Sequence, residues 1–499
     1  MTSTLTPHER GPPLMYPATD QARRSALNEA ERLRRLSSTD RDLIRLVHEP
    51  QFPRWLAQIK ATGGCAHPIY LSGQTTIRDA ADGTVLHHYD TASEPGGRLA
   101  VRCRNRRRSR CEPCSREHAG DTYHLVRSGL HGGKGVSERV QLHPRLLLTL
   151  TAPSFGPVHK ATTDGRLCRS ANAGSNCDHG RSHTCHRRHE EGDPAVGQPL
   201  CPDCYDYPGH VLWHAHAGRL WTRFCHTARR RLATRAGIAQ TRLGGHLTLS
   251  FAKVAEYQRR AAVHFHAVVR LDGPDGPSTP PPAWATPELL AEVLEDAAAA
   301  AHVRTAYSPA TGERLIAFGP QMDVHAISGT ALSGAVTDDA VAAYVAKYVS
   351  KSIGDAGGLD RRVTDRDSIE LAPVSAHIRA LMGTCWRLGA LPELTCLNLR
   401  AWAHALGFRG HVLTKSRRYS TTYGELRTAR AEYRGSLGVV KAKEGGTLRE
   451  SFWRFVGSGH TAAEAEIASG VARHIECARQ LEQQDRELQR SPRVSGEDQ

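Results

Sequence analysis

The chain of 499 residues contains 13 cysteines, and two pairs of them constrain the fold more than any other feature. The pairs have the spacing Cys-x-x-Cys and are Cys111 with Cys114 and Cys201 with Cys204. Two thiolates on such a short turn can occupy two corners of a tetrahedral zinc site, so each pair needs two further ligands. Segments that are distant in the sequence must therefore meet around each pair.

The rest of the sequence indicates that these cysteines are thiols rather than disulfides. The polar N-terminus lacks a signal-peptide pattern, and no apolar run approaches the roughly 20 residues that cross a bilayer. We expect a cytoplasmic protein with no membrane partner, and disulfides are rare in the cytoplasm. Free buried thiols are the alternative to metal binding, and we expect them at Cys225, Cys385, Cys396 and Cys477.

Cysteines near each pair complete the expected zinc sites. For the first pair, the candidates are Cys65 and Cys103. For the second pair they are Cys177 and Cys185, with Cys168 a weaker choice. Several histidines in the same segment can substitute as ligands: His179, His183, His186 and His189. We therefore expect one structural Zn²⁺ ion at each pair, holding together loops that are too polar to form a core.

An alternating segment at residues 263–269 points to a different kind of site. Its β-branched and aromatic residues predict a strand, on which His264 and His266 share one face while Phe265 faces the other side. Two imidazoles on a rigid strand can bind one divalent metal ion. A nucleotide hydrolase of the histidine-triad type needs a third alternating histidine, and Val268 occupies that position, so this class is excluded.

Residues 344–351 repeat a four-residue unit, Tyr-Val-Ala-Lys followed by Tyr-Val-Ser-Lys. On a helix, Tyr344 and Tyr348 share a face, and Lys347 and Lys351 each follow a tyrosine by three residues. Such phenols, each with its own ammonium group, are suited to attack on phosphates. The alternative explanation of this spacing is that the tyrosines belong to the packed, apolar face of an amphipathic helix. The histidine strand upstream favours catalysis, because it supplies a metal site for the two phenols.

Together, His-Phe-His and the later Tyr-x-x-x-Tyr resemble the HUH endonucleases, specifically rolling-circle replication initiators, which nick one DNA strand through a tyrosine. The histidines precede the tyrosines in the chain, and this order of motifs favours initiators over conjugative relaxases, whose tyrosine lies near the N-terminus. The doubled tyrosine is similar to that of single-stranded-phage initiators. Residues 145–153 read as a buried strand that ends at a proline, and this family carries such a Thr-Leu-Thr strand beside the histidine strand.

The resemblance extends to the initiators of actinomycete plasmids and integrative elements, from Cys65 to about residue 460. Five stretches carry it: residues 110–114, 199–207, 255–260, 406–411 and 414–422. It implies an α+β fold in which an HUH endonuclease core, with a central antiparallel sheet of the ferredoxin or RRM type flanked by helices, is joined to zinc-binding modules.

The implied activity is that of a metal-dependent, site-specific nickase and strand transferase. A tyrosine attacks one strand at a double-stranded origin and forms a 5′-phosphotyrosine. The freed 3′-hydroxyl primes rolling-circle replication, and the strand is rejoined afterwards. Tyr348 with Lys351 is expected to initiate, because single-tyrosine relatives align there and carry glutamate at Tyr344. Tyr344 with Lys347 would then make the second cut, after one turn of the circle has been copied.

The catalytic metal ion is expected to be Mg²⁺ or Mn²⁺, bound by His264, His266 and a third ligand on the neighbouring strand. Glu256 is the candidate, because a hairpin of residues 247–257 and 262–271 places it on that strand. A surface role is the alternative for Glu256.

The landmarks divide the chain into an N-terminal segment, 1–60, that is helical and partly disordered, a first zinc module at 61–140, and an endonuclease domain at 141–360. A zinc-bearing insertion lies at about 159–210 of that domain. A helical, basic region at 361–480 and a disordered tail at 481–499 follow. Further helices are expected at 32–55, 211–236, 287–303, 340–352, 378–389 and 401–406, and a strand at 322–327.

Lys and Arg number 66 against 51 Asp and Glu, giving a formal net charge of +15, which suits a polyanionic partner. Ordinary basicity of a composition rich in Arg, Ala and Gly is the alternative. The resemblance implies origin DNA, double- and single-stranded, as that partner. Arginines of the first zinc module and a later basic stretch are candidate DNA contacts, with a solvated surface as the alternative: Arg104, Arg106, Arg107, Arg108, Arg110, Lys415, Arg417 and Arg418.

No ATPase motif of the P-loop form is present, so a host helicase and a DNA polymerase are expected partners. Two other functions remain open. A two-tyrosine HUH transposase would use the same chemistry at element ends, and a zinc-stabilised DNA-binding regulator would carry the same motifs as inert remnants.

Overall fold

The computed structural model describes residues 31, 35–162, 167–168, 176–328, 336–351, 353–436 and 446–490. The chain divides into two compact units, one formed by Met1–Arg102 with Ala442–Gln499 and the other by Cys103–Lys441. The segment expected to form one zinc module, 61–140, is therefore shared between the units. Most of the N-terminal stretch expected to be disordered, and residues 491–499 of the expected disordered tail, lie outside the described residues.

The larger unit is organised around a six-stranded sheet of described residues, in the order β10-β9-β4-β6-β5-β11. From one edge to the other, these strands are Val336–Thr337, Met322–Ser328, Arg145–Leu150, Val263–Asp272, Thr248–Tyr257 and Leu413–Lys415. β10 runs parallel to β9, and the remaining pairs are antiparallel. The expected α+β class with an antiparallel central sheet is confirmed at this level, and the ferredoxin or RRM type stays a prediction.

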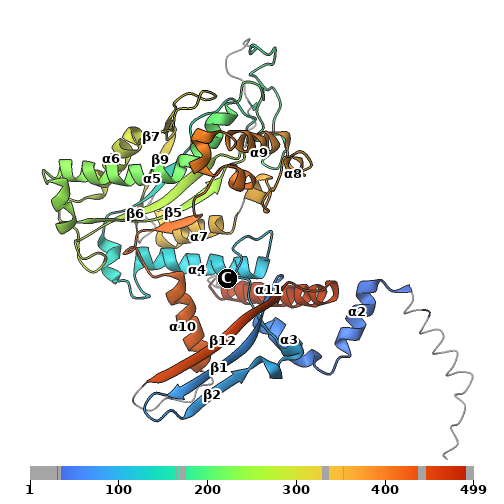
Figure 1. The fold of residues 1–499 in the computed structure, drawn as a ribbon. Helices are drawn as coiled ribbons and strands as arrows, with labels where there is room; N and C mark the ends of the chain where they lie inside the picture. The colour runs from blue at the N-terminus through green and yellow to red at the C-terminus, as the bar shows by residue number, and fades with distance from the viewer. Residues whose placement is uncertain are drawn as a thin grey trace, which may run out of the picture. The chain divides into compact units, whose positions relative to one another are not determined.

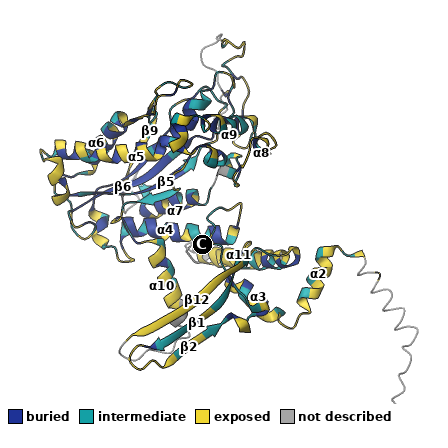
Figure 2. Ribbon diagram, viewed as in Figure 1, coloured by how far each residue is buried: buried dark blue, intermediate teal, exposed yellow. Residues whose placement is uncertain are grey.

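Helices cover both faces of this sheet (Figure 1). On one face lie α5 (Tyr207–Arg235), α6 (Pro287–Ala300) and α9 (Ala376–Leu388), and on the other lie α4 (Glu112–His131) and α7 (Asp338–Val349). Figure 2 shows buried residues along β5 and β6, as expected for strands covered on both sides. The histidine strand β6 is therefore a rigid central element.

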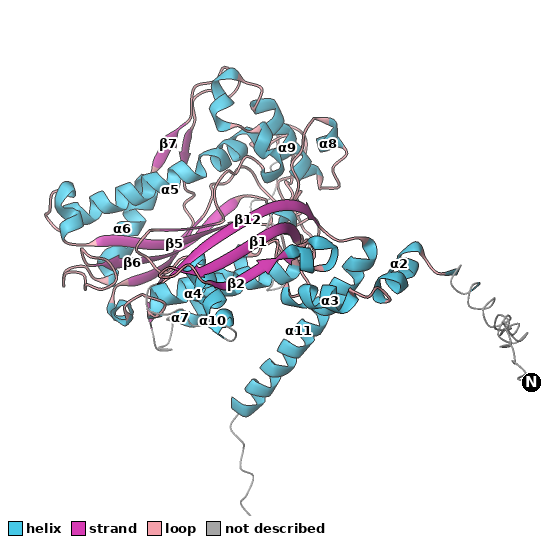
Figure 3. Ribbon diagram, turned by 60° about the horizontal axis from the view of Figure 1, so that its bottom comes forward, coloured by secondary structure: helices cyan, strands magenta, loops and turns pink. Residues whose placement is uncertain are grey.

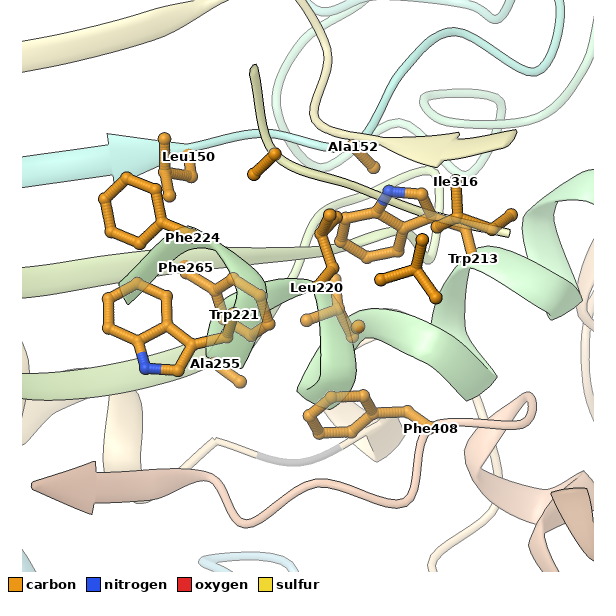
Figure 4. Packing of buried hydrophobic residues seen from close by; sticks show 14 of the residues in the cluster. Leu150, Ala152, Trp213, Leu220, Trp221, Phe224, Ala255, Phe265, Ile316 and Phe408 are labelled. Atoms are coloured by element: carbon orange, nitrogen blue, oxygen red, sulfur yellow. The ribbon is translucent and has the colours of Figure 1, made fainter. Parts of the chain in front are cut away.

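The alternation of β6 sends its side chains into two separate cores. Phe265 is fully buried between Trp213 and Trp221 of α5, with ring centroids 6.3 and 5.8 Å away (Figure 4). Val268 belongs to the opposite core, which it shares with residues of α7 such as Val345. The two histidines have the parity of Val268 and therefore face α7.

The expected hairpin, the strand at 322–327 and the helices at 211–236, 287–303, 340–352 and 378–389 are all present, with shifted ends. Residues 401–405 instead belong to a 3₁₀ helix, Arg400–Ala405, which is followed by Leu406 in the left-handed region. The unit's remaining elements are the helices α8 (Asp367–Glu370) and α10 (Tyr423–Ser436), the strands β7 (His302–Arg304) and β8 (Leu315–Ala317), and the 3₁₀ helices Glu138–Leu142, Gln240–Gly245, Ile353–Ala356 and Pro392–Leu397.

The smaller unit contains a second, antiparallel sheet (Figure 3). Its central strand β1 (Ile69–Asp79) pairs with β12 (Thr447–Ser458), β2 (Val85–Asp90) and β3 (Leu99–Val101). The helices are α2 (Ser38–Val47), α3 (Phe52–Ala61) and α11 (Ala462–Arg490), with the 3₁₀ helices Thr91–Ser93 and Pro95–Gly97. Among the described residues, no helix combines the length and apolar character needed to cross a membrane.

Two expectations for the smaller unit differ from the structure, and two of its strands were not expected. The single helical segment expected at 32–55 contains a break between α2 and α3. The strands β1 and β12 were not predicted, because Thr, Ser and Arg interrupt their apolar residues. Residues 481–490, expected to be disordered, are the last turns of α11, where charged residues pair along the helix, as Arg486 does with Glu482.

Candidate active site and metal clusters

Three polar side chains converge where β5 and β6 pair. Glu256 lies directly opposite His264 in the strand register, and His266 follows two residues later on the same face. The Oε2 atom of Glu256 is 3.0 Å from Nε2 of His264 and 3.3 Å from Nε2 of His266. The two Nε2 atoms are 3.1 Å apart. Two nitrogen donors and a carboxylate oxygen therefore surround one point.

This donor set fits a divalent metal ion. Separations near 3 Å are those of atoms that share one cation at about 2.1 Å, and nitrogen with carboxylate oxygen suits Mn²⁺ or Mg²⁺ at a phosphate. Thr149 of β4 lies opposite His266, and its Oγ1 is 3.1 Å from Nδ1 of that ring. If Nδ1–H donates to this hydroxyl, Nε2 stays free to bind a cation.

The ionisation of the ligands also favours a cation. Burial acts to raise the pKa of Glu256, but hydrogen bonds with His264, His266 and Lys351 outweigh it and lower that pKa to about 2. Burial lowers the pKa of His266 below its usual value, because the imidazolium is poorly solvated there. The carboxylate is therefore charged, and the His266 ring is held in the neutral form that a metal ion requires.

The tyrosine helix α7 is held firmly at its N-terminus. Thr337 caps it by accepting a hydrogen bond from the amide of Ala340. Arg145, on the strand β4, donates to the buried Asp338 at 2.7 Å, and Arg127 of α4 pairs with Asp339 at 2.6 Å. The first-turn acids thus join the helix to the sheet and to α4, in addition to favouring the positive end of the helix dipole.

The C-terminal end of α7 is held by the loop between Cys103 and Cys111. Nη1 of Arg106 donates to the carbonyl oxygens of Val349 at 3.1 Å and Lys351 at 2.7 Å. Carbonyls at a helix end lack partners within the helix, so the guanidinium satisfies groups that would otherwise need water. The arginine expected to contact DNA therefore has its Nη1 engaged in positioning the tyrosine helix.

Both tyrosines lie against His266. The ring of Tyr348 stacks on the imidazole at a centroid distance of 5.2 Å, and the hydroxyl of Tyr344 is 3.3 Å from its Nε2. The two phenol rings contact each other edge to face, with centroids 4.6 Å apart. One helix face thus brings both candidate nucleophiles to a single metal-binding group.

The two lysines do not divide between the tyrosines as expected. Lys351 lies 4.4 Å from the ring centroid of Tyr348, and its Nζ is 2.7 Å from Oε1 of Glu256, in agreement with its expected pairing. Lys347 is exposed, and its Nζ lies 6.0 Å from the ring of Tyr348 rather than serving Tyr344. Its long stem reaches toward the C-terminal side of the repeat, so both cations accompany Tyr348.

A cleft of about 460 Å³ opens on the Tyr348 side of the histidine pair. Its lining includes four basic side chains, Arg106, Arg259, Lys347 and Lys351, together with Glu256. Two further acids, Glu191 and Asp355, also line it. Tyr348 therefore faces an open space with nearby positive charge, which suits a phosphate.

A second cleft, of about 530 Å³, opens on the Tyr344 side. Asp323 and His325 of β9 line it, and His264 lines both clefts. Burial raises the pKa of Tyr344, and hydrogen bonding with Tyr348 and the negative charge of Glu256 raise it further. The two tyrosines thus share one donor set but differ in electrostatic surroundings.

Cys111 and Cys114, the first Cys-x-x-Cys pair, lie close to a third cysteine, Cys103. The sulfur atoms of Cys103, Cys111 and Cys114 lie within 4.8 Å of one another. Cys111 immediately precedes α4 and Cys114 lies in its first turn, which explains the tight Cys-x-x-Cys geometry. Cys65, the expected fourth ligand, belongs to the other compact unit and stays a prediction.

The second pair gathers a different set from the expected one. Cys201 and Cys204 lie with Cys177 and His179, whereas Cys185 does not belong to this group. The expectation of Cys185 as its ligand is therefore corrected to His179, one of the alternatives. One residue separates Cys177 from His179, and a hairpin-like turn, in which the Cys177 N–H donates to the carbonyl of Arg181 at 2.8 Å, directs both toward the pair.

Cys185 instead belongs to a third cluster that the sequence did not predict. It lies with His159, Cys168 and His189, and the four ligand atoms are within 4.8 Å of one another. Cys168 and His189 were each considered for the second pair, but their meeting with His159 was missed. No Cys-x-x-Cys spacing marks this cluster, so its only sequence signal is the density of Cys and His residues at 159–189.

The candidate DNA contacts fall into engaged and exposed groups. Nη1 of Arg107 donates to the carbonyl of Asp360 at 2.6 Å, and Lys415 donates to the carbonyl of Ser420 at 2.8 Å. The exposed candidates are Arg104, Arg108, Arg110, Arg417 and Arg418, of which Arg108 lies near Glu112 and Arg418 donates to the carbonyl of Pro274. Exposure leaves these arginines accessible to a phosphate backbone.

Sequence reasoning did not assign Asp323, His325, Gln321 or Gln258, which line the cleft beside Tyr344. The prediction of a strand at 322–327 carried the relevant signal, because alternation puts Asp323 and His325 on one face. Register was the missing information, since Thr149 pairs with Asp323 on one side and with His266 on the other.

Comparison with known proteins gives one consistent result. The RepSA family model, described as "Replication initiator protein, pSAM2", matches residues 51–473. A replication initiator protein of Streptomyces ambofaciens is 45% identical over 451 residues, which cover 88% of this chain and 94% of that protein. No solved structure matches the chain.

Proposed function

The chain belongs to the RepSA family of replication initiator proteins, and from this premise we propose that it nicks one strand of origin DNA through Tyr348. The nick would leave a 5′-phosphotyrosine and a 3′-hydroxyl that primes rolling-circle replication. One observation carries the proposal: both tyrosines of α7 contact His266, whose Nε2 belongs to the three-donor group with Glu256 and His264.

Glu256, His264 and His266 would hold the divalent ion, whose role when bound is to polarise the scissile phosphate and neutralise its charge. Tyr348 supplies the nucleophilic oxygen. Its Oη forms a bond to phosphorus while the bond from phosphorus to the 3′-oxygen breaks, and the phenolic proton ends on that 3′-oxygen. Lys351, held near the ring by its ion pair with Glu256, would stabilise the developing phenolate.

The surroundings of the two phenols support Tyr348 as the first nucleophile. Both Lys347 and Lys351 lie over its ring, whereas burial and neighbouring negative charge raise the pKa of Tyr344. A phenol with a raised pKa is a poorer nucleophile near neutral pH, because less of it ionises. Tyr344 would act second, after one round of synthesis, when Tyr348 already carries the displaced strand.

The DNA would follow the exposed basic side chains. Arg417 and Arg418 lie just beyond β11, the strand that pairs with β5, and Arg108 lies in the loop that holds α7. Phosphate contacts by such arginines give affinity without sequence readout. A host helicase and a polymerase would then open and copy the circle. Family membership favours this reading over a transposase, and the complete donor set with two tyrosines favours it over an inert regulator.

The proposal is tested with the full-length chain, Mn²⁺ and supercoiled DNA of the replicon or integrative element that encodes it. We expect open circular DNA and a covalent adduct on the 5′ end of the nicked strand. The Tyr348→Phe variant should form no adduct, whereas Tyr344→Phe should retain the first nick and lose strand closure. Mass spectrometry of the adduct peptide identifies the linked tyrosine.

Tyr433→Phe is a matched control, because Tyr433 is an exposed tyrosine of α10. It should nick as the unmodified chain does. Nicking that survives in both Tyr348→Phe and Tyr344→Phe, without a covalent adduct, would show that water rather than tyrosine is the nucleophile. Adduct formation lost only in Tyr344→Phe would reverse the order of the two tyrosines.

A further inference from the structure

The metal-ligand residues between β4 and α5 occur in an interleaved order. Taken in pairs along the chain, the first and third pairs form one cluster, and the second and fourth pairs form the other. The first cluster is His159, Cys168, Cys185 and His189, and the second is Cys177, His179, Cys201 and Cys204. The chain must therefore enter the first cluster, visit the second, return to the first and finish in the second.

The first cluster has the chemistry of a closed tetrahedral site. Sγ of Cys185 is 3.4 Å from Nε2 of His189, and Sγ of Cys168 is 3.8 Å from Nδ1 of His159. Cys168, Cys185 and His189 are buried. Nδ1 of His189 contacts Oδ2 of Asp193 at 2.6 Å, the arrangement in which a carboxylate orients a metal-binding imidazole.

The second cluster combines three thiols with one imidazole. Nδ1 of His179 is 3.3 Å from Sγ of Cys204, and Cys201 is buried beside them. Two cysteines with two histidines, and three cysteines with one histidine, are both ligand sets of structural zinc sites. Soft thiolates in closed, four-ligand groups favour Zn²⁺ over Mg²⁺ or Mn²⁺.

The segment that carries both clusters lacks regular secondary structure in its described residues. Within its described residues, the stretch from 151 to 206 contains neither a helix nor a strand, and its ladder contacts are the isolated bridges Val158 to Pro199 and Asn176 to Ser182. A loop of this length without secondary structure needs another source of stability, and metal binding supplies it.

We propose that the eight residues of the two clusters, with the described chain around them, form one cross-braced module that binds two Zn²⁺ ions, one in each cluster. Because the clusters share the same interleaved chain, removal of either ion releases loops that contribute to the other. The two ions therefore bind and leave as a coupled pair. This inference does not depend on the proposed nicking activity.

The module contacts the β-hairpin that carries the candidate active site. Gly197 has a φ of +88°, and a Cβ atom there would lie 2.3 Å from the carbonyl oxygen of Arg259 in the hairpin turn. Arg260 of the same turn donates to the carbonyls of Ala152 and Pro153, which lie just before the module in the chain. The zinc ions therefore support the turn that follows Glu256.

Zinc content and zinc release test the proposal in the full-length chain. Cys185→Ser removes a ligand of the first cluster and Cys201→Ser a ligand of the second. Each variant should lose at least one zinc equivalent by elemental analysis and should release the module's remaining ion to a chromogenic chelator about tenfold faster. Cys396→Ser is the matched control, since Cys396 is exposed and outside the clusters, and it should keep the zinc content of the unmodified chain.

Unchanged zinc in Cys185→Ser would overturn the first site. Loss of one equivalent in each variant, with an unchanged release rate for the other ion, would overturn the cross-braced coupling. A second measurement avoids variants that fail to fold: timed alkylation of the unmodified chain, before and after chelation. Cys168 and Cys185 should become reactive at the same rate as Cys177, Cys201 and Cys204. Two separate rates, or equal reactivity with and without chelator, would contradict the proposal.

Discussion

Two regions of the larger unit gather metal-binding side chains in different ways. The group of Glu256, His264 and His266 stands on two paired strands, and Glu256 and His264 border an open cleft. The clusters of the insertion stand on loops, and most of their cysteines are buried. The first group is positioned by a fold that already exists, whereas the second supplies the contacts that its own segment lacks.

Under the two proposals above, this difference separates a site for chemistry from sites for structure. An open group with oxygen and nitrogen donors leaves coordination positions for a substrate, while a closed group with thiolates leaves none. Metal loss should therefore inactivate the strand-borne site without unfolding it, and should unfold the loop-borne module. The experiments below test that contrast, from the largest expected effect to the smallest.

The largest effect is expected from His266→Ala. This change removes a ligand atom and the ring that both tyrosines contact, so nicking should fall by about a thousandfold. The sheet keeps its backbone pairing, so the free energy of unfolding should fall by only about 1–2 kcal/mol. A gel assay of supercoiled DNA and thermal unfolding measure the two quantities.

His325→Ala is the matched control for that variant, because His325 lines the neighbouring cleft but is not one of the donor group. Its nicking rate should stay within about threefold of the unmodified chain. A thousandfold loss in this control as well would mean that general disruption of the cleft, rather than loss of a ligand, explains His266→Ala.

The next largest effect is expected from chelation. A brief treatment should abolish nicking without changing the melting temperature, and Mn²⁺ should restore activity fully. Prolonged chelation should remove the buried thiolate-bound ions, lower the melting temperature and leave a loss that Mn²⁺ does not reverse. If nicking activity and the melting temperature fall together from the first minutes of chelation, the proposed difference between the two regions is wrong.

Glu256→Gln should have a more selective effect. The amide keeps the size of the side chain but removes the charge that binds the cation and pairs with Lys351. The Mn²⁺ concentration for half-maximal nicking should rise by about 10–100-fold, with most of the rate recovered at saturating metal. Glu191→Gln, in the same cleft but outside the donor group, should leave the metal dependence unchanged.

The smallest effect is expected from Arg106→Lys, which tests whether the cysteine-bearing loop positions α7. Lysine has a shorter reach than arginine and lacks its rigid planar head, so its ammonium is not held where Nη1 donates to Val349 and Lys351, and stability should fall by about 1 kcal/mol. Nicking should fall by about two- to tenfold with unchanged metal dependence, because the ligands stay in place.

Arg108→Lys is its control, since the side chain of Arg108 is exposed and pairs only loosely with Glu112 at 3.5 Å. It should change neither stability nor the rate on short DNA. An equal loss of nicking in both variants would indicate that loss of DNA contact, and not helix positioning, accounts for the effect of Arg106→Lys.

The geometry of the strand-borne group was largely predictable from spacing. Period-two alternation put His264 and His266 on one face, and the expected hairpin put Glu256 on the neighbouring strand, whereas the register that pairs Glu256 with His264 came from the structure. The helical period put Tyr344 and Tyr348 together. Regular elements repeat their geometry, so the positions of side chains follow from counting residues.

The partners of the cysteines and of the charged side chains were less predictable. Loops have no period, so proximity in sequence suggested Cys185 for the second cluster, while the interleaved chain path carries it to the first. Likewise, Lys347 and Arg106 have flexible stems, and their contacts depend on which groups the fold brings near.

By itself, the sequence determined the family and the class of fold, which follow from its resemblance to replication initiators, and the residue types that can bind metal or attack a phosphate, which follow from spacing and periodicity. Only the tertiary structure decided that His266 contacts both tyrosines, that both lysines accompany Tyr348 and that eight ligands form two interlocked clusters. These facts depend on distances between separate segments of the chain, which packing sets for the sheet and α7 and which the proposed zinc ions would set for the clusters.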